Sequence, residues 1–139
     1  MPPPFEYQNP TLQFERFLVA ARDHAGLATT NMAWNMVVGV LHSFRAHLSL
    51  EQAIAFAQVL PPMVRALFTD DWDPGLPPTP FGSPAELLAE VRAVRHEHNF
   101  SPDNAIEAVA RALHEQVEPA AFDRALAALP PPARDYWAV

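Results

Sequence analysis

The chain has 139 residues, half of them hydrophobic, a formal net charge of −7 and no cysteine. This composition allows a packed core in one domain or in two small halves, and it excludes disulfides, thiolate nucleophiles and cysteine-based metal sites. The negative charge, with nine scattered arginines and no lysine, argues against nucleic-acid binding, because affinity for phosphate needs clustered cations.

The chain begins with a Pro-rich arm over residues 1–10, and four helices are predicted to follow it. Apolar residues at three- and four-residue spacing indicate these helices over about 11–25, 30–47, 50–59 and 62–68. Gly26 is expected to stop the first helix. Ser49 is expected to open the third through a capping box, and that helix is predicted to bury Leu50 and Ile54.

A Pro-rich connector at residues 70–82 interrupts this pattern, since its four prolines and two glycines exclude regular helix or sheet. The same spacing then predicts four more helices, over about 84–94, 102–113, 122–129 and 131–137. Ser83 and Ser101 each precede a proline and are expected to cap the first two of them. No segment alternates apolar and polar residues as a strand would, so the predicted fold is all-α with eight helices.

The two sets of four helices share a sequence element. Leu60-Pro61-Pro62 precedes Arg65, and Leu129-Pro130-Pro131 precedes Arg134, at a constant offset of 69 residues. We therefore predict two pseudo-symmetric four-helix repeats. Repeats of about 60 residues bury only a marginal core, so we expect them to share one, with large side chains from the first two helices of each. The predicted segments are the arm, repeat one, the connector and repeat two, over residues 1–10, 11–69, 70–82 and 83–139.

Short motifs in this chain follow one another in an order that resembles a known family. In the first half they are Phe17-Leu18, Leu60-Pro61 with Arg65, and Asp71-Trp72-Asp73-Pro74. The second half has Leu87-Leu88, and Leu129-Pro130 with Arg134. Together they resemble the bacterial Domain of Unknown Function 2267 family, from about Leu12 to Trp137. The resemblance implies an all-helical fold of two related halves, with no assigned activity.

The six histidines raise the question of a metal or catalytic site, and the candidates are His24, His42 and His114. His42 and His114, 72 residues apart, occupy equivalent positions beside a core leucine. The alternative for these two is structural, a hydrogen bond at the edge of the core. The chain has no Glu-x-x-His pairs of the kind that hold two metals in a helical bundle. We therefore predict no catalytic residue, no metal and no cofactor.

The candidates for binding a partner or an anion are Arg65, Arg134, Trp72 and Trp137. The two arginines either define equivalent anion or partner sites, or tie each short helix to the end of a neighbouring helix. The two tryptophans either belong to an exposed apolar patch or fill the space between the halves.

These observations predict a non-enzymatic protein-interaction module, because stacked helical hairpins present binding surfaces, with a protein partner or a homo-oligomer and no nucleic acid. One alternative is a small-ligand binder with an apolar pocket between the halves, suggested by Met36, Met63, Phe44 and Phe56. The other is a metal protein or enzyme that uses the three histidines with glutamates. No signal-peptide pattern is found and the longest apolar run, 36–41, is too short to span a bilayer, so a cytoplasmic protein is expected.

Overall fold

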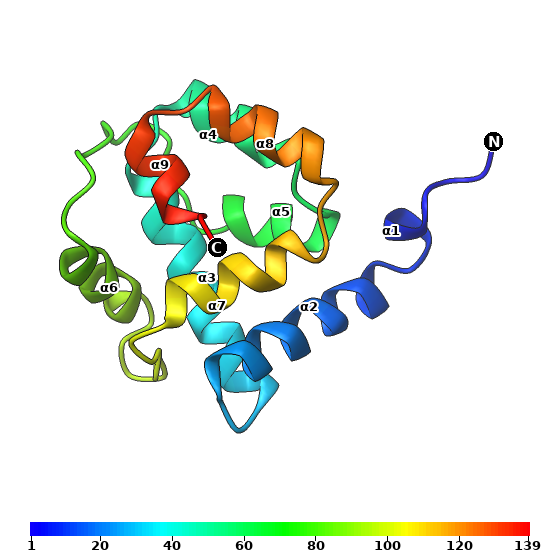
Figure 1. The fold of residues 1–139 in the computed structure, drawn as a ribbon, viewed down its shortest axis with the longest axis horizontal. Coiled ribbons are helices and arrows are strands. Elements are labelled where there is room, and N and C mark those ends of the chain that lie inside the picture. The colour runs from blue at the N-terminus through cyan, green and yellow to red at the C-terminus, as the bar shows by residue number, and fades with distance from the viewer.

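The computed structural model describes residues 1–139 and contains helices and no strand, which confirms the all-α class (Figure 1). There are nine helices rather than eight. In chain order they are α1 (Phe5–Gln8), α2 (Pro10–Ala25), α3 (Thr30–Ala46), α4 (Leu50–Ala57), α5 (Pro62–Thr69), α6 (Pro84–Ala93), α7 (Ala105–His114), α8 (Pro119–Ala127) and α9 (Pro131–Tyr136). None of them combines the length and the apolar character that crossing a bilayer requires.

The additional helix is α1, a single turn within the arm, which extends away from the body of the protein (Figure 1). Its last residue, Gln8, donates a side-chain hydrogen bond to the carbonyl of Pro3 (2.7 Å). Prolines ahead of the turn lose no hydrogen bond, because N–H groups at a helix start are unpaired in any case. Asn9 precedes Pro10 and leaves the helical region, with φ −133° and ψ 54°, which separates α1 from α2.

Local capping residues set several helix limits at the predicted positions. Gly26 ends α2 with φ 71°, a left-handed conformation that glycine adopts without strain. Thr29 caps α3 by accepting a hydrogen bond from the N–H of Met32. Ser49 and Ser83 open α4 and α6 through complete capping boxes. These predictions are confirmed because each depends on residues within one turn of the helix end.

The predicted cap at Ser101 is wrong. The backbone N–H and the hydroxyl of Ser101 both donate to the side-chain oxygen of Asn99. The amide group of Asn99 donates in turn to the carbonyls of Val91 and Val94 at the end of α6, at 2.8 Å each. The hydroxyl of Ser101 is therefore occupied by a long-range turn, and α7 begins only at Ala105.

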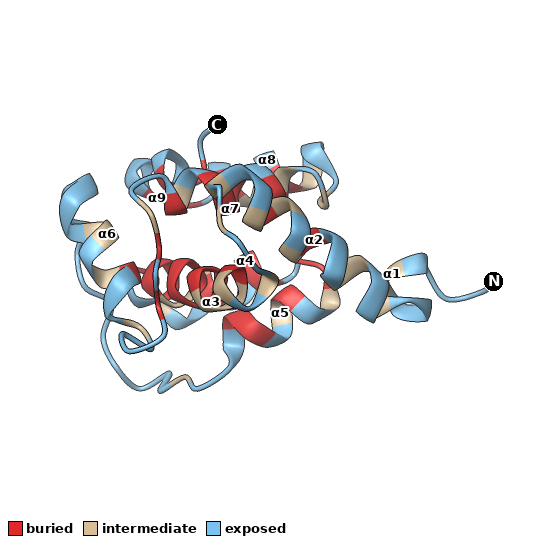
Figure 2. Cartoon of the chain, turned by 90° about the horizontal axis from the view of Figure 1, so that it is seen from below, coloured by how far each residue is buried: buried red, intermediate tan, exposed pale blue.

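Helices from both sides of the connector alternate in one core. α2 packs against α3 and α7, and α3 also packs against α5, α6 and α7. Figure 2 shows the buried residues along α3 and on the inward faces of the helices around it. In the connector, Trp72 and Phe81 are half-buried and pack against this core.

The largest rings of the core meet around Trp137. Its ring centroid lies 5.3 Å from Phe44 and Tyr136, 5.8 Å from Phe56 and 6.4 Å from Phe122. Only Phe44 belongs to a helix that was expected to supply large side chains, so that expectation is wrong for most of the cluster. The rings come mainly from the short helices α4, α8 and α9, which lie together on one side of α3 and α7 (Figure 1).

The predicted burial of Leu50 and Ile54 is also wrong. These side chains are 46% and 50% exposed. α4 has only eight residues and turns a single face towards the core, formed by Ala53, Phe56 and Ala57. The apolar residues on its other side are left at the surface.

Candidate functional site

A groove with a volume of about 560 Å³ lies between α6, α7 and α9. Its apolar lining includes Phe81, Leu87, Leu88, Ile106, Tyr136 and Ala138. Three carboxylates, those of Asp103, Glu107 and Asp135, complete the lining, and no arginine or histidine does. The volume falls in the range of about 300–1,000 Å³ that is usual for ligand sites. The groove can therefore take an apolar group and favours a cation over an anion at its edge.

The groove exists because α6 and α2 pack differently. α2, with 16 residues, packs on both α3 and α7, and its Phe14 contacts Trp34 of α3 edge to face at 6.2 Å. α6, with 10 residues, packs on α3. The space between α6 and α7 is left open and is lined by Leu88 from one helix and Ile106 from the other.

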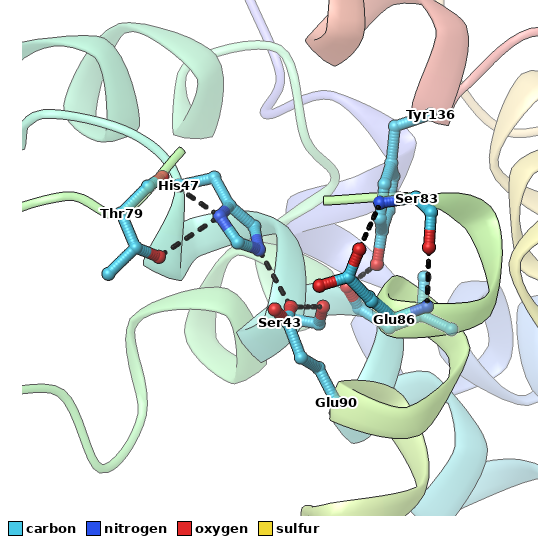
Figure 3. A network of polar contacts seen from close by, with 8 residues as sticks. Ser43, His47, Thr79, Ser83, Glu86, Glu90 and Tyr136 are labelled. Carbon is cyan, nitrogen blue, oxygen red and sulfur yellow. Dashed lines mark hydrogen bonds and ion pairs between the residues drawn. The ribbon is translucent and has the colours of Figure 1, made fainter. Parts of the chain in front are cut away.

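A buried polar network fixes α6 against α3 next to this groove (Figure 3). The Nδ1 atom of His47 lies 2.9 Å from the carbonyl oxygen of Thr79, and its Nε2 atom lies 2.7 Å from a carboxylate oxygen of Glu90. The hydroxyl of Ser43 donates to the same Glu90 oxygen at 2.8 Å. Since Ser43 donates to a carboxylate and not to the histidine, it is not placed as a nucleophile beside a base. The network acts as a tie between α3, the connector and α6.

The network supports two aromatic walls of the groove. Phe81 packs on the ring of His47, with the centroids 4.6 Å apart. Tyr136 donates its hydroxyl hydrogen bond to the buried carbonyl of Val40 at 2.7 Å. Burial raises the pKa of Tyr136 far above its usual value, so the phenol stays protonated and keeps this donor. Both rings are therefore held in place from the core side.

Sequence reasoning missed this network because its partners are distant along the chain, with 43 residues between His47 and Glu90. One signal was available. Ser43 and His47 lie four residues apart on a helix whose neighbouring positions are apolar. Two polar residues on one turn of a buried helix indicate a partner on an adjacent element, because buried polar groups are normally hydrogen-bonded.

His42 and His114 both make the structural contact that was the alternative to a metal site. The Nε2 atom of His42 lies 2.8 Å from the carbonyl of Leu67, near the end of α5. The Nε2 atom of His114 lies 2.8 Å from the carbonyl of Trp137, just after α9. Burial is the main cause that lowers the pKa of His42, which favours the neutral ring that donates this bond.

His24 lies apart from the other two histidine candidates, at the end of α2. Its Nε2 atom pairs with the carboxylate of Glu115 at 2.7 Å, and both side chains are exposed to solvent. No group of three or more histidine, aspartate or glutamate side chains is arranged to hold a metal ion. The structure thus gives each of the three histidines a separate partner.

The two candidate arginines lie in different surroundings. Arg65 donates from Nε to the carbonyl of Ala57 (2.9 Å) and from Nη2 to that of Leu60 (3.0 Å), just after α4. It also contacts the hydroxyl of Tyr7 in the arm (3.3 Å). Arg134 is exposed and makes no hydrogen bond or ion pair. The tie to a neighbouring helix end therefore describes Arg65.

Replacing these arginines is expected to have unequal effects. Arg65→Ala removes charge-assisted bonds to two carbonyls and should lower the free energy of unfolding by about 1–2 kcal/mol. Arg134→Ala, the matched control, should change it by less than about 0.5 kcal/mol. Urea unfolding followed by circular dichroism measures both. Equal losses would mean that Arg134 makes a contact as strong as that of Arg65.

The two candidate tryptophans do not form one surface. Trp137 is fully buried in the aromatic cluster. Trp72 is half-buried, and the guanidinium of Arg45 lies 5.4 Å from its ring centroid. Arg45 also donates to the carbonyls of Phe68 and Asp70 at 2.8 Å each, and so joins α3 to the end of α5. Sequence reasoning did not single out Arg45.

The apolar residues that suggested a pocket between the halves lie elsewhere. Met36, Phe44 and Phe56 are fully buried in the packed core. Met63 is 40% exposed on α5. The hollow that does accept a ligand-sized group lies between the helices that follow the connector.

These features define a class: an all-helical protein whose helices share one core and whose surface carries an apolar groove. Within that class, residues 14–136 match the family described as "Uncharacterized conserved protein (DUF2267)". The chain belongs to this family, which confirms the resemblance found in its motifs. No curated protein matches the chain.

Proposed function

We propose that the protein is a non-enzymatic interaction module of the bacterial cytoplasm that binds a segment of a partner protein in the groove between α6, α7 and α9. The observation that carries this proposal is the groove itself, an apolar hollow of about 560 Å³ beside a filled core. Apolar surface left open next to well-fixed walls is typical of binding sites. The network around His47 supplies the fixed walls.

We also propose that α2–α5 and α6–α9 are two repeats. α2 packs on α7, and α6 packs on α3, which is the exchange that a pseudo-twofold axis would produce. Pro61 and Pro130 precede the last helix of each set with nearly the same backbone angles, φ −58° and −59° with ψ 154°. His42 and His114 each bond a carbonyl at the end of that helix. Under this relation, the groove lies where the first repeat packs α2 on α3.

The binding site can be tested with the only two isoleucines of the chain, Ile54 and Ile106. Ile106 lines the groove, whereas Ile54 lies exposed on α4 and does not. Peptides of about twelve residues, selected from a random display library, are titrated into protein labelled with ¹³C at the isoleucine δ1 methyl groups. We expect the Ile106 resonance to shift in a saturable way and the Ile54 resonance to remain in place.

A matched pair of variants on α6 controls this experiment. Ala85 is exposed and lines the groove, whereas Ala89 is exposed on the same helix outside it. Ala85→Arg should weaken binding about tenfold by blocking the groove, and Ala89→Arg should leave it unchanged. Selected peptides that leave Ile106 unmoved would overturn the proposal. So would saturable binding at Ile106 by a fatty acid but by none of the peptides.

A further inference from the structure

We infer, building on the proposed function, that the partner segment places an aromatic side chain in the groove and a positively charged residue beside Asp135. Two independent observations support this chemistry. One is what fills the equivalent space in the first half of the chain. The other is the set of charges that line the groove.

The first half fills this space with aromatic rings. Phe14 of α2 and Trp34 of α3 meet edge to face there at 6.2 Å. At offsets of 70 and 72 residues, their counterparts are Pro84 and Ile106, and both of these line the groove. The second half therefore has two smaller residues where the first has a pair of rings. The volume that is left open corresponds to aromatic side chains.

The walls of the groove suit a ring as well. Phe81 and Tyr136 both line it, and their own centroids lie 6.4 Å apart. Aromatic side chains prefer edge-to-face or offset contact with other rings, which adds about 0.5–1.5 kcal/mol to the burial of their area. An aromatic anchor would gain this contact, and an aliphatic anchor would not.

The charges at the groove are negative, and one of them has no partner. Asp103 pairs with Arg92 and Glu107 pairs with Arg111, each at 2.9 Å. Asp135, next to Tyr136 at the end of α9, forms no ion pair. A cationic residue next to the anchor would meet this free carboxylate. An acidic segment would be repelled by it and by the net charge of −7.

The arm of a second copy of this chain is the competing occupant. It carries exposed aromatic rings at Phe5 and Tyr7, and it extends away from the body (Figure 1). The residue between these rings is Glu6, which has the wrong charge for a groove lined by carboxylates. Charge therefore favours a separate, cationic segment over this arm.

The test compares three synthetic forms of the best selected peptide: the parent, one with its aromatic residue changed to alanine, and one with its basic residue changed to glutamine. Dissociation constants come from titration of the Ile106 methyl resonance. Removing the ring should weaken binding about tenfold or more, and removing the charge about threefold to tenfold at low salt.

A double-mutant cycle assigns the charge contact to one residue. Asp135→Asn should weaken binding of the parent about threefold to tenfold and should leave binding of the glutamine peptide unchanged. Asp123→Asn, at an exposed site on α8 outside the groove, is the matched control and should have no effect. A reduced response to salt in Asp135→Asn would agree with a lost ion pair.

The outcomes separate this inference from the proposed function. Peptides that bind at Ile106 without any dependence on a ring or on Asp135 would overturn the inference and leave the proposed function standing. Peptides that never shift Ile106 would overturn both. A shift of Ile106 that depends on protein concentration alone, with a dimer in sedimentation, would place the arm of a second copy in the groove and overturn the inference.

Discussion

Trp137→Ala is expected to lower the free energy of unfolding by about 3–5 kcal/mol. Trp137 is fully buried, and four other aromatic rings surround it, so its removal leaves a cavity that the neighbours cannot close. Trp72→Ala is the natural comparison, because Trp72 is half-buried and contacts mainly Arg45. It should lose about 1 kcal/mol. Equilibrium unfolding in urea measures both variants.

Trp137→Phe separates the packing of the ring from its polar group. The indole N–H is buried and has no hydrogen-bond partner. An unpaired buried donor costs about 1–3 kcal/mol, so a phenyl ring removes a penalty while it keeps most of the ring contacts. We expect Trp137→Phe to lose less than about 1.5 kcal/mol. A loss as large as that of Trp137→Ala would mean that the N–H is paired in solution.

The contrast between the two tryptophans shows how far sequence can predict this fold. Helix limits such as Gly26 and Ser49 were predictable, because each depends on hydrogen bonds within a few residues. The start of α7 was not, because Ser101 is drawn to Asn99, which itself bonds the end of α6. A capping motif that competes with a tertiary contact is decided by structure that the motif does not contain.

The groove could be predicted even less well than the fold. Leu87 and Ile106 belong to apolar stripes, and a stripe predicts burial against a neighbouring helix. Whether that neighbour arrives depends on the angle of α6, which its contact with α3 sets. Both side chains are therefore half-buried and line an open groove. The position of α6 is the property that sequence could not supply, and one residue largely determines it.

That residue is Gly39, where α3 and α6 approach most closely. A Cβ at this position would lie 2.5 Å from the backbone carbonyl oxygen of Val91, closer than real Cβ atoms come to other atoms. In an ordinary helix interior, Gly→Ala stabilises by about 1 kcal/mol. Gly39→Ala is instead expected to destabilise the protein by about 2–3 kcal/mol, since the added methyl must push α6 away.

Two further variants test this reason in urea unfolding. Because the clash is with backbone, trimming the neighbour in Gly39→Ala/Val91→Ala should not restore stability. Gly75→Ala in the connector would meet only the flexible side chain of Asp73, at 3.2 Å, and should change stability by less than about 0.5 kcal/mol.

Displacement of α6 should also reach the groove. Glu90 lies on α6, so moving this helix lengthens its contact with His47 and loosens the wall that Phe81 forms on that ring. We expect the Ile106 methyl resonance of Gly39→Ala to move even without peptide, and peptide affinity to fall about tenfold. A Gly39→Ala protein with wild-type stability and an unshifted Ile106 would show that α6 can leave α3 without strain. The fixed wall on which the binding proposal depends would then be absent.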